Sequence, residues 1–141
     1  METRMDKAAL QAFMQRDFSQ VAGEFEFVEV APPFLTLALI TQERHLRPGG
    51  TVSGPSMFGL ADVTAYFCIL SVLGPVGLAV TTNCSIDFMR KPTPGRLLCR
   101  MEILKLGRAL AVCEGRIYTQ GHDHKPVARA SLTYSIPPQK G

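Results

Sequence analysis

The fold is decided by the stretch GPSMFGLADVTAYFCILSVLG, which runs from Gly54 to Gly74. Its residues are apolar on nearly every side of a helix, so a helix here must be covered on most sides by the rest of the chain. Ser53 or Gly54 can serve as the N-cap, Pro55 suits the first helical position, and Gly74 followed by proline ends the pattern. The stretch therefore predicts a buried central helix over about residues 54–73.

Asp62 lies in the middle of this helix and is the only charged residue between Arg47 and Asp87. Burying an ionised carboxylate without partners is costly, so the group must be compensated or neutralised. Groups in such places often have perturbed pKa values, and perturbed groups cluster at sites of chemistry. A structural carboxylate capped by hydroxyls or backbone donors is the alternative, and the helix alone does not decide between the two.

The rest of the chain predicts mostly strands. Residues 24–30 alternate charged and apolar side chains, which is typical of a half-exposed strand, and a short amphipathic helix is expected over residues 5–18. The predicted strands cover residues 24–30, 34–40, 77–89, 95–106, 109–119 and 126–136. A single antiparallel sheet of five or six strands can curl around the helix, so we expect one α+β domain over residues 1–141. The sheet edges invite pairing with a second copy of the chain, so a homodimer or a dimer of dimers is expected.

Composition narrows the possible partners. Of the 141 residues, 46% are hydrophobic and 19% charged, and the net charge is only +3, which fits a globular protein and argues against nucleic-acid binding. The apolar run from Met57 to Leu73 is short for a membrane span and carries a carboxylate, so we expect no membrane insertion.

The cysteines and histidines predict neither a metal site nor a redox site. The cysteines, at positions 68, 84, 99 and 113, are too far apart for a Cys-x-x-Cys motif, and the charged start of the chain lacks an apolar leader. Reduced thiols in the cytoplasm are therefore expected. His122 and His124 lack a third ligand, so we expect no metal and no other cofactor.

Two runs of sequence resemble a known family. Residues 50–64 contain Leu60-Ala61-Asp62, and residues 79–92 contain Ile86-Asp-Phe-Met-Arg90. Together they resemble the hotdog-fold acyl-CoA thioesterases of the phenylacetate-pathway type, over about Arg47 to Tyr134. The resemblance implies a hotdog fold and acyl-CoA hydrolysis at a dimer interface, with coenzyme A present as part of the substrate.

The resemblance also implies roles for three residues. Asp62 matches the aspartate that attacks the thioester carbonyl or activates water, Gly54 matches the glycine whose backbone N–H polarises that carbonyl, and Thr81 matches an assisting hydroxyl. Gly54 precedes Asp62 by eight residues, or about 12 Å along a helix, which is too far for one carbonyl to touch both. A site completed across two subunits is therefore expected.

The chain departs from the family pattern near the start of the helix. Ser53 replaces the family's histidine, Pro55 its second glycine and Arg47 an asparagine, and Lys91 separates Arg90 from the following proline. The alternative to an enzyme is therefore a catalytically weak protein that binds acyl-CoA or another acyl ligand. A hotdog hydratase is disfavoured, because the helix has no Asp-x4-His pair.

Strand alternation predicts that Thr81 points away from its own core unless a bulge intervenes, with Thr82 as the fallback. Ser53 and Ser56, at the helix start, have helix capping as their alternative role. Lysine and arginine side chains in loops are often simply solvent-exposed charges with no binding role. Four of the cations, Arg90, Lys91, Lys105 and Arg108, are candidates for holding the phosphates of coenzyme A. The full set of candidate substrate-binding residues is Ser53, Ser56, Arg47, Thr82, Asn83, Arg90, Lys91, Lys105 and Arg108.

Overall fold

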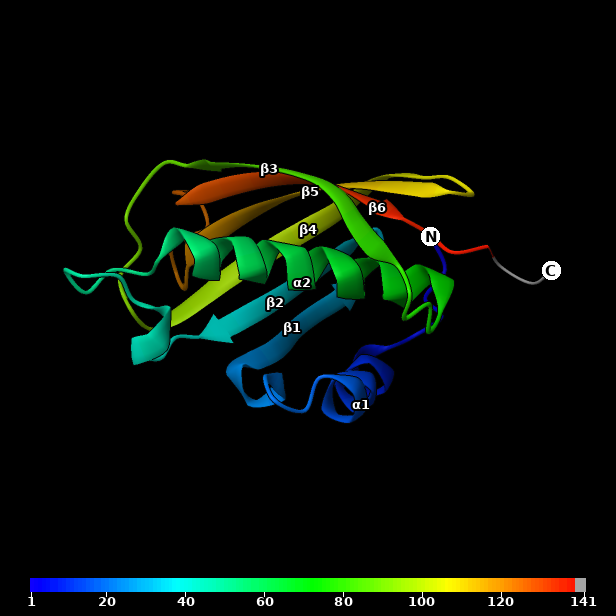
Figure 1. The fold of residues 1–141 in the computed structure, drawn as a ribbon, viewed down its shortest axis with the longest axis horizontal. Coiled ribbons are helices and arrows are strands. Elements are labelled where there is room, and N and C mark those ends of the chain that lie inside the picture. Colours follow the sequence, from blue (N-terminus) through cyan, green and yellow to red (C-terminus); the bar gives the residue numbers. More distant parts are fainter. Residues whose placement is uncertain (139–141) are drawn as a thin grey trace.

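A computed structural model describes residues 1–138 and contains a six-stranded antiparallel sheet with one long helix across it (Figure 1). The helices are α1 (Lys7–Asp17) and α2 (Gly54–Leu73), with short 3-10 turns η1 (Ala22–Glu24) and η2 (Glu43–His45). The strands are β1 (Phe25–Ala31), β2 (Phe34–Ile40), β3 (Val80–Phe88), β4 (Arg96–Leu106), β5 (Leu110–Thr119) and β6 (Ala128–Ser135). The α+β architecture predicted from the sequence is confirmed.

Helix α2 begins and ends where the sequence predicts. Ser53 is the N-cap, and its Oγ accepts the N–H of Ser56 at 3.2 Å, while Gly74 ends the helix with a positive φ of 87°. Pro55 occupies the second helical position, one later than predicted, because Gly54 is the first helical residue. By length and composition α2 could cross a membrane, yet 67% of its most apolar window is buried in the domain.

The strand order is β1-β2-β4-β5-β6-β3, so β1 and β3 form the two edges of the sheet. The sheet curves around α2, and side chains from the helix, the sheet and α1 form one hydrophobic core (Figure 1). Strand β3 begins at Val80, three residues later than predicted, because residues 76–79 form a turn closed by the Ala79 N–H on the Val76 carbonyl at 2.9 Å. Helix α1 contributes Leu10, Phe13 and Met14 to the core.

Gly115 on β5 gives a stability prediction. A Cβ at this position would lie 2.7 Å from Met101 Cε and 3.0 Å from the Arg100 carbonyl oxygen. The methionine side chain can move but the carbonyl cannot, so Gly115→Ala is expected to lower the free energy of unfolding by about 1–3 kcal/mol. Urea unfolding would measure this. Gly23→Ala is the matched control, since nothing lies within 4 Å of its Cβ position, and equal losses in the two variants would contradict the prediction.

Candidate active site

The Asp62 carboxylate is held by two hydroxyls. Thr81 Oγ1 and the Tyr134 hydroxyl each donate to Asp62 Oδ1 at 2.5 Å, and the Tyr134 hydroxyl also lies 2.7 Å from the Asp62 carbonyl oxygen. Burial raises the pKa of Tyr134 well above its ordinary value, and the hydrogen bond to Asp62 raises it further, so the phenol stays a donor. Both hydroxyls bind the same oxygen, and within residues 1–138 no hydrogen bond is made by Oδ2. One carboxylate oxygen is therefore fixed and the other is available.

A bulge in β3 brings Thr81 to Asp62. In the pairing of β3 with β6, Thr81 lies opposite Tyr134 but Asn83 lies opposite Thr133, so one extra residue is inserted at Thr82. Uninterrupted alternation would have turned Thr81 away from the helix, and the bulge reverses this. Thr82 is exposed and its hydroxyl donates to the Thr133 carbonyl at 3.2 Å, so the fallback candidate does not reach Asp62.

A cleft of about 400 Å³ lies beside the Asp62 carboxylate. Its lining side chains are mostly apolar, and three of them come from α1 and the segment that follows this helix. Its lining is Met14, Phe18, Val21, Asp62, Val63, Tyr66, Phe67, Gly77, Ala79, Val80, Thr81 and Tyr134. The cleft therefore pairs an apolar chamber with a single free carboxylate oxygen, which suits an apolar group attached to a reactive polar one.

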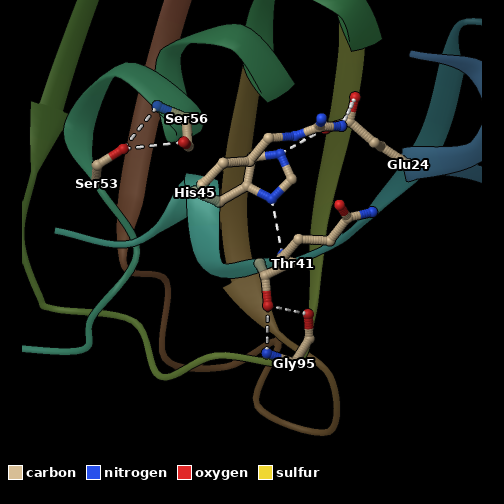
Figure 2. A network of polar contacts seen from close by, with 8 residues as sticks. Glu24, Thr41, His45, Ser53, Ser56 and Gly95 are labelled. Carbon is tan, nitrogen blue, oxygen red and sulfur yellow. Dashed lines mark hydrogen bonds and ion pairs between the residues drawn. The ribbon is translucent and has the colours of Figure 1, made fainter. Parts of the chain in front are cut away.

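The start of α2 presents one free backbone donor. Pro55 has no N–H, and the N–H of Ser56 is occupied by Ser53 Oγ. Ser53 Oγ also donates to Ser56 Oγ at 2.9 Å, so both serines are engaged in capping the helix (Figure 2). In the described part of the chain the Gly54 N–H has no partner. This unpaired amide stands at the positive end of the helix dipole, which favours negative charge.

Gly54 opens into a second cleft, of about 380 Å³, that shares no lining residue with the first. The Phe88 ring packs over Gly54, and its Cζ lies 3.4 Å from the position that a Cβ on Gly54 would occupy. The lining residues are Arg47, Val52, Gly54, Met57, Phe88, Met89, Arg90, Lys91 and Pro92. Two of the predicted phosphate-binding cations, Arg90 and Lys91, thus line the same cleft as Gly54, together with Arg47. The Arg90 guanidinium also donates to the Pro126 carbonyl.

The other predicted substrate-binding residues are not brought together in one chain. Lys105 and Arg108 are exposed at the β4–β5 turn, at the end of the molecule opposite the start of α2 (Figure 1). Asn83 is exposed on the edge strand β3. Asp62 and Gly54 likewise belong to separate clefts, in line with the distance expected along the helix.

Other reactive side chains do not compete with Asp62. Burial raises the pKa of the Cys99 and Cys113 thiols to about 12, so both stay protonated and unreactive at neutral pH. Over residues 1–138, no group of three histidine, cysteine or acidic side chains is placed to hold a metal.

Two residues with structural roles around the site were missed by sequence reasoning. Tyr134 is buried on β6, but its contact with Asp62 joins two elements whose residues are 72 positions apart in the sequence. His45 stands alone in the loop before the central helix in the sequence, and the structure buries it away from the lining of both clefts. The one sequence feature that pointed to Tyr134 is the alternation along the last strand, which places this tyrosine on the face toward the core.

Comparisons with known proteins show which fold and family this chain shares. The structure is similar to that of a candidate thioesterase from Silicibacter sp. TM1040, with 53% identity, a TM-score of 0.90 and coverage of 98% of this chain and 96% of that chain. It is also similar to a mutant of the phenylacetic acid degradation protein PaaI from Thermus thermophilus, with 25% identity, a TM-score of 0.70 and coverage of 89% and 98%. Zebrafish thioesterase superfamily member 2 shares the fold, with 20% identity, a TM-score of 0.82 and coverage of 94% and 99%.

A long helix wrapped by a six-stranded antiparallel sheet, as in these structures, defines a hotdog-fold protein. A family model described as the thioesterase superfamily matches residues 49–124, and the chain belongs to that superfamily. No curated protein matches the chain. The family and the fold that the sequence resembled are therefore confirmed.

Proposed function

We propose that this thioesterase hydrolyses acyl-CoA thioesters to a free acid and coenzyme A. The observation that carries the proposal is the Asp62 carboxylate, with Oδ1 fixed by two hydroxyls and Oδ2 free beside an apolar cleft. The apolar cleft suits the acyl group, and the Arg47, Arg90 and Lys91 side chains suit the phosphates of coenzyme A. No metal or redox cofactor takes part in the proposed reaction, and the proposed location is the cytoplasm.

The proposed reaction begins at the thioester carbonyl. Asp62 Oδ2 either attacks the carbonyl carbon itself or removes a proton from a water molecule that attacks it. The carbonyl electron pair moves onto oxygen, where the Gly54 N–H and the helix dipole stabilise the negative charge. When the tetrahedral intermediate collapses, the C–S bond breaks and the coenzyme A thiolate leaves. If water attacked, the product is the free acid, and the proton that Asp62 took from water passes to the thiolate. If Asp62 attacked, the acyl group remains on Oδ2 as a mixed anhydride, which water then hydrolyses to the free acid, and the released proton passes to the thiolate.

A homodimer paired through β3 would bring the two halves of the site together. Thr81, next to Asp62, and Phe88, next to Gly54, lie near opposite ends of this edge strand. If two copies of β3 pair antiparallel about a two-fold axis between Cys84 and Ser85, Phe88 of one copy faces Thr81 of the other. The cleft containing Gly54 of one subunit then adjoins the cleft containing Asp62 of its partner.

Release of free thiol from a panel of fatty and aryl acyl-CoAs tests the proposed activity. The expected result is saturable thiol release from at least one member of the panel. Saturable binding of the esters, without thiol release above the background of an Asp62→Asn variant, would instead identify an acyl-CoA binding protein. This is the alternative that the sequence raises through Ser53.

The two hydroxyls on Asp62 Oδ1 give a further prediction. Tyr134→Phe and Thr81→Val each remove one hydrogen bond to a charged group, and each is expected to lower kcat about 10-fold with little change in KM. Steady-state kinetics on the best substrate would measure this. Thr82→Val is the matched control on the same strand, because among residues 1–138 the one hydrogen bond of the Thr82 hydroxyl is to the Thr133 carbonyl. An equal loss in the control would contradict the assignment.

A further inference from the structure

A buried polar network lies beneath the start of α2. His45 is only 8% exposed; its Nδ1 accepts the Gln42 N–H at 2.8 Å, and its Nε2 lies 2.6 Å from Glu24 Oε1. Because Nδ1 accepts a hydrogen bond, Nε2 carries the proton and donates to the carboxylate. Figure 2 shows His45 between Glu24 and the capped first turn of the helix.

Glu24 is fitted to its role as an acceptor. Burial alone would raise the pKa of its carboxyl group, but hydrogen bonds from Arg44 and His45 outweigh burial and hold the pKa below its ordinary value. The Arg44 guanidinium, 2.5 Å from Glu24 Oε2, approaches from the solvent side, and its side chain is 58% exposed. The carboxylate therefore has a buried partner, His45, and an exposed partner, Arg44.

The backbone links His45 directly to the helix start. The His45 carbonyl accepts the Ser53 N–H at 2.8 Å, and the Arg47 N–H donates to the Thr51 carbonyl at 2.8 Å, so residues 45–53 form a short hairpin. The Ser53 carbonyl accepts the Met57 N–H at 3.1 Å. Both peptide groups that flank Ser53 are thus hydrogen-bonded, and the second of them carries the free Gly54 N–H.

We propose that His45 and Glu24 are positioning residues for the Gly54 amide, acting through the His45 carbonyl and Ser53; this inference rests on the proposed hydrolysis. Neither side chain lines either cleft, so neither touches the substrate. A preorganised hydrogen-bond donor stabilises the transition state only when it is held at the place where negative charge develops, and a small displacement of the donor lowers the rate strongly. His45, eight residues before Ser53, thus holds this turn from inside the core.

His45→Asn is the sharpest test, because asparagine can still accept the Gln42 N–H but cannot reach Glu24. The expected result is a kcat about 10-fold lower with KM within about twofold of wild type. Arg44→Gln is the matched control; it removes the exposed partner of Glu24 and is expected to leave kcat within about twofold. Circular dichroism would verify folding. If His45→Asn does not fold, Glu24→Ala, which removes the acceptor of the His45 ring, replaces it with the same expected loss of kcat.

A double-mutant cycle separates positioning from general stability. In a Gly54→Pro background the amide hydrogen is absent, so adding His45→Asn is expected to lower kcat no further. An equal fold-loss in both backgrounds would overturn the proposal.

A readout without substrate keeps this inference distinct from the proposed function. The Gly54 amide cross-peak in a ¹H–¹⁵N spectrum is expected to shift in His45→Asn and to stay in place in Arg44→Gln. An unmoved peak in His45→Asn would overturn the link between His45 and Gly54 even if the enzyme is active. A moved peak in a protein that releases no thiol would instead refute the hydrolysis and leave the link standing.

Discussion

Replacing Asp62 with asparagine is expected to lower kcat on the order of 1,000-fold, because the amide can neither attack the thioester nor accept a proton from water. Asparagine keeps an oxygen at the position of Oδ1, so it can still accept the hydrogen bonds from Thr81 and Tyr134. The fold and the binding of acyl-CoA should therefore survive. Thiol release measures the first effect, and titration of the variant with a non-hydrolysable acyl-CoA analogue measures the second.

Asparagine can deamidate back to aspartate, so Asp62→Ala serves as the control for contaminating activity. If Asp62 were a structural carboxylate only, Asp62→Asn would lose activity in proportion to its loss of stability. A variant that keeps both its melting temperature and full thiol release would contradict a catalytic role. A variant that keeps its melting temperature but loses thiol release would support that role.

Gly54→Pro is expected to lower kcat by about 100- to 1,000-fold, because it deletes the one free N–H at the start of α2. The backbone is suited to this change. Ser53 has φ −73° and ψ 155°, the extended conformation that a residue before proline prefers, and proline is favoured in the first helical position. The main effect should therefore be on kcat, measured from thiol release at saturating substrate.

Gly54→Ala is the matched control, because alanine keeps the N–H. Its Cβ would meet the Phe88 ring at 3.4–3.8 Å, which is ordinary van der Waals contact. Activity near wild type for alanine together with a large loss for proline would isolate the contribution of the hydrogen. Equal losses in the two variants would point to crowding against Phe88 and would count against the amide as the carbonyl-binding donor.

The two variants together test whether a site spans two subunits. If Asp62 of one chain works with Gly54 of its partner, a mixed dimer of Asp62→Asn and Gly54→Pro chains has one intact site and one doubly altered site. Random mixing would then restore roughly one quarter of wild-type activity, since half of the dimers are mixed and each has one of two sites intact. No restoration is expected if both residues of a site come from the same chain.

The sequence alone predicts most of the architecture. The 54–73 helix is apolar all round and cleanly capped, so its bounds agree with those of α2, and strand patterns predict six strands to within a few residues. The errors lie at element ends, as at residues 76–79, where a turn delays β3. Local patterns decide these features, and local patterns are what a sequence displays most directly.

The candidate site is predicted less completely. Asp62 is conspicuous as a lone charge in an apolar helix, but Tyr134 reaches it from β6, 72 residues later in the chain, through the packing of the sheet on α2, which no local pattern encodes. His45 meets Glu24 across 21 residues of sequence because two short 3-10 turns, neither of them predicted, bring the side chains together. Long-range packing and irregular turns thus set the limits of the prediction.

The single extra residue at Thr82 makes the length of β3 as important as its composition. Before the bulge the inward positions of the strand are odd-numbered and include Thr81, whereas after it they are even-numbered and include Cys84 and Ile86. Deleting one residue here would restore a continuous ladder and keep nearly every side chain, yet it would rotate the first part of the strand by half a turn. Related chains could therefore gain or lose the Thr81 hydroxyl at Asp62 by insertion or deletion, and a comparison that scores substitutions alone would overlook the change.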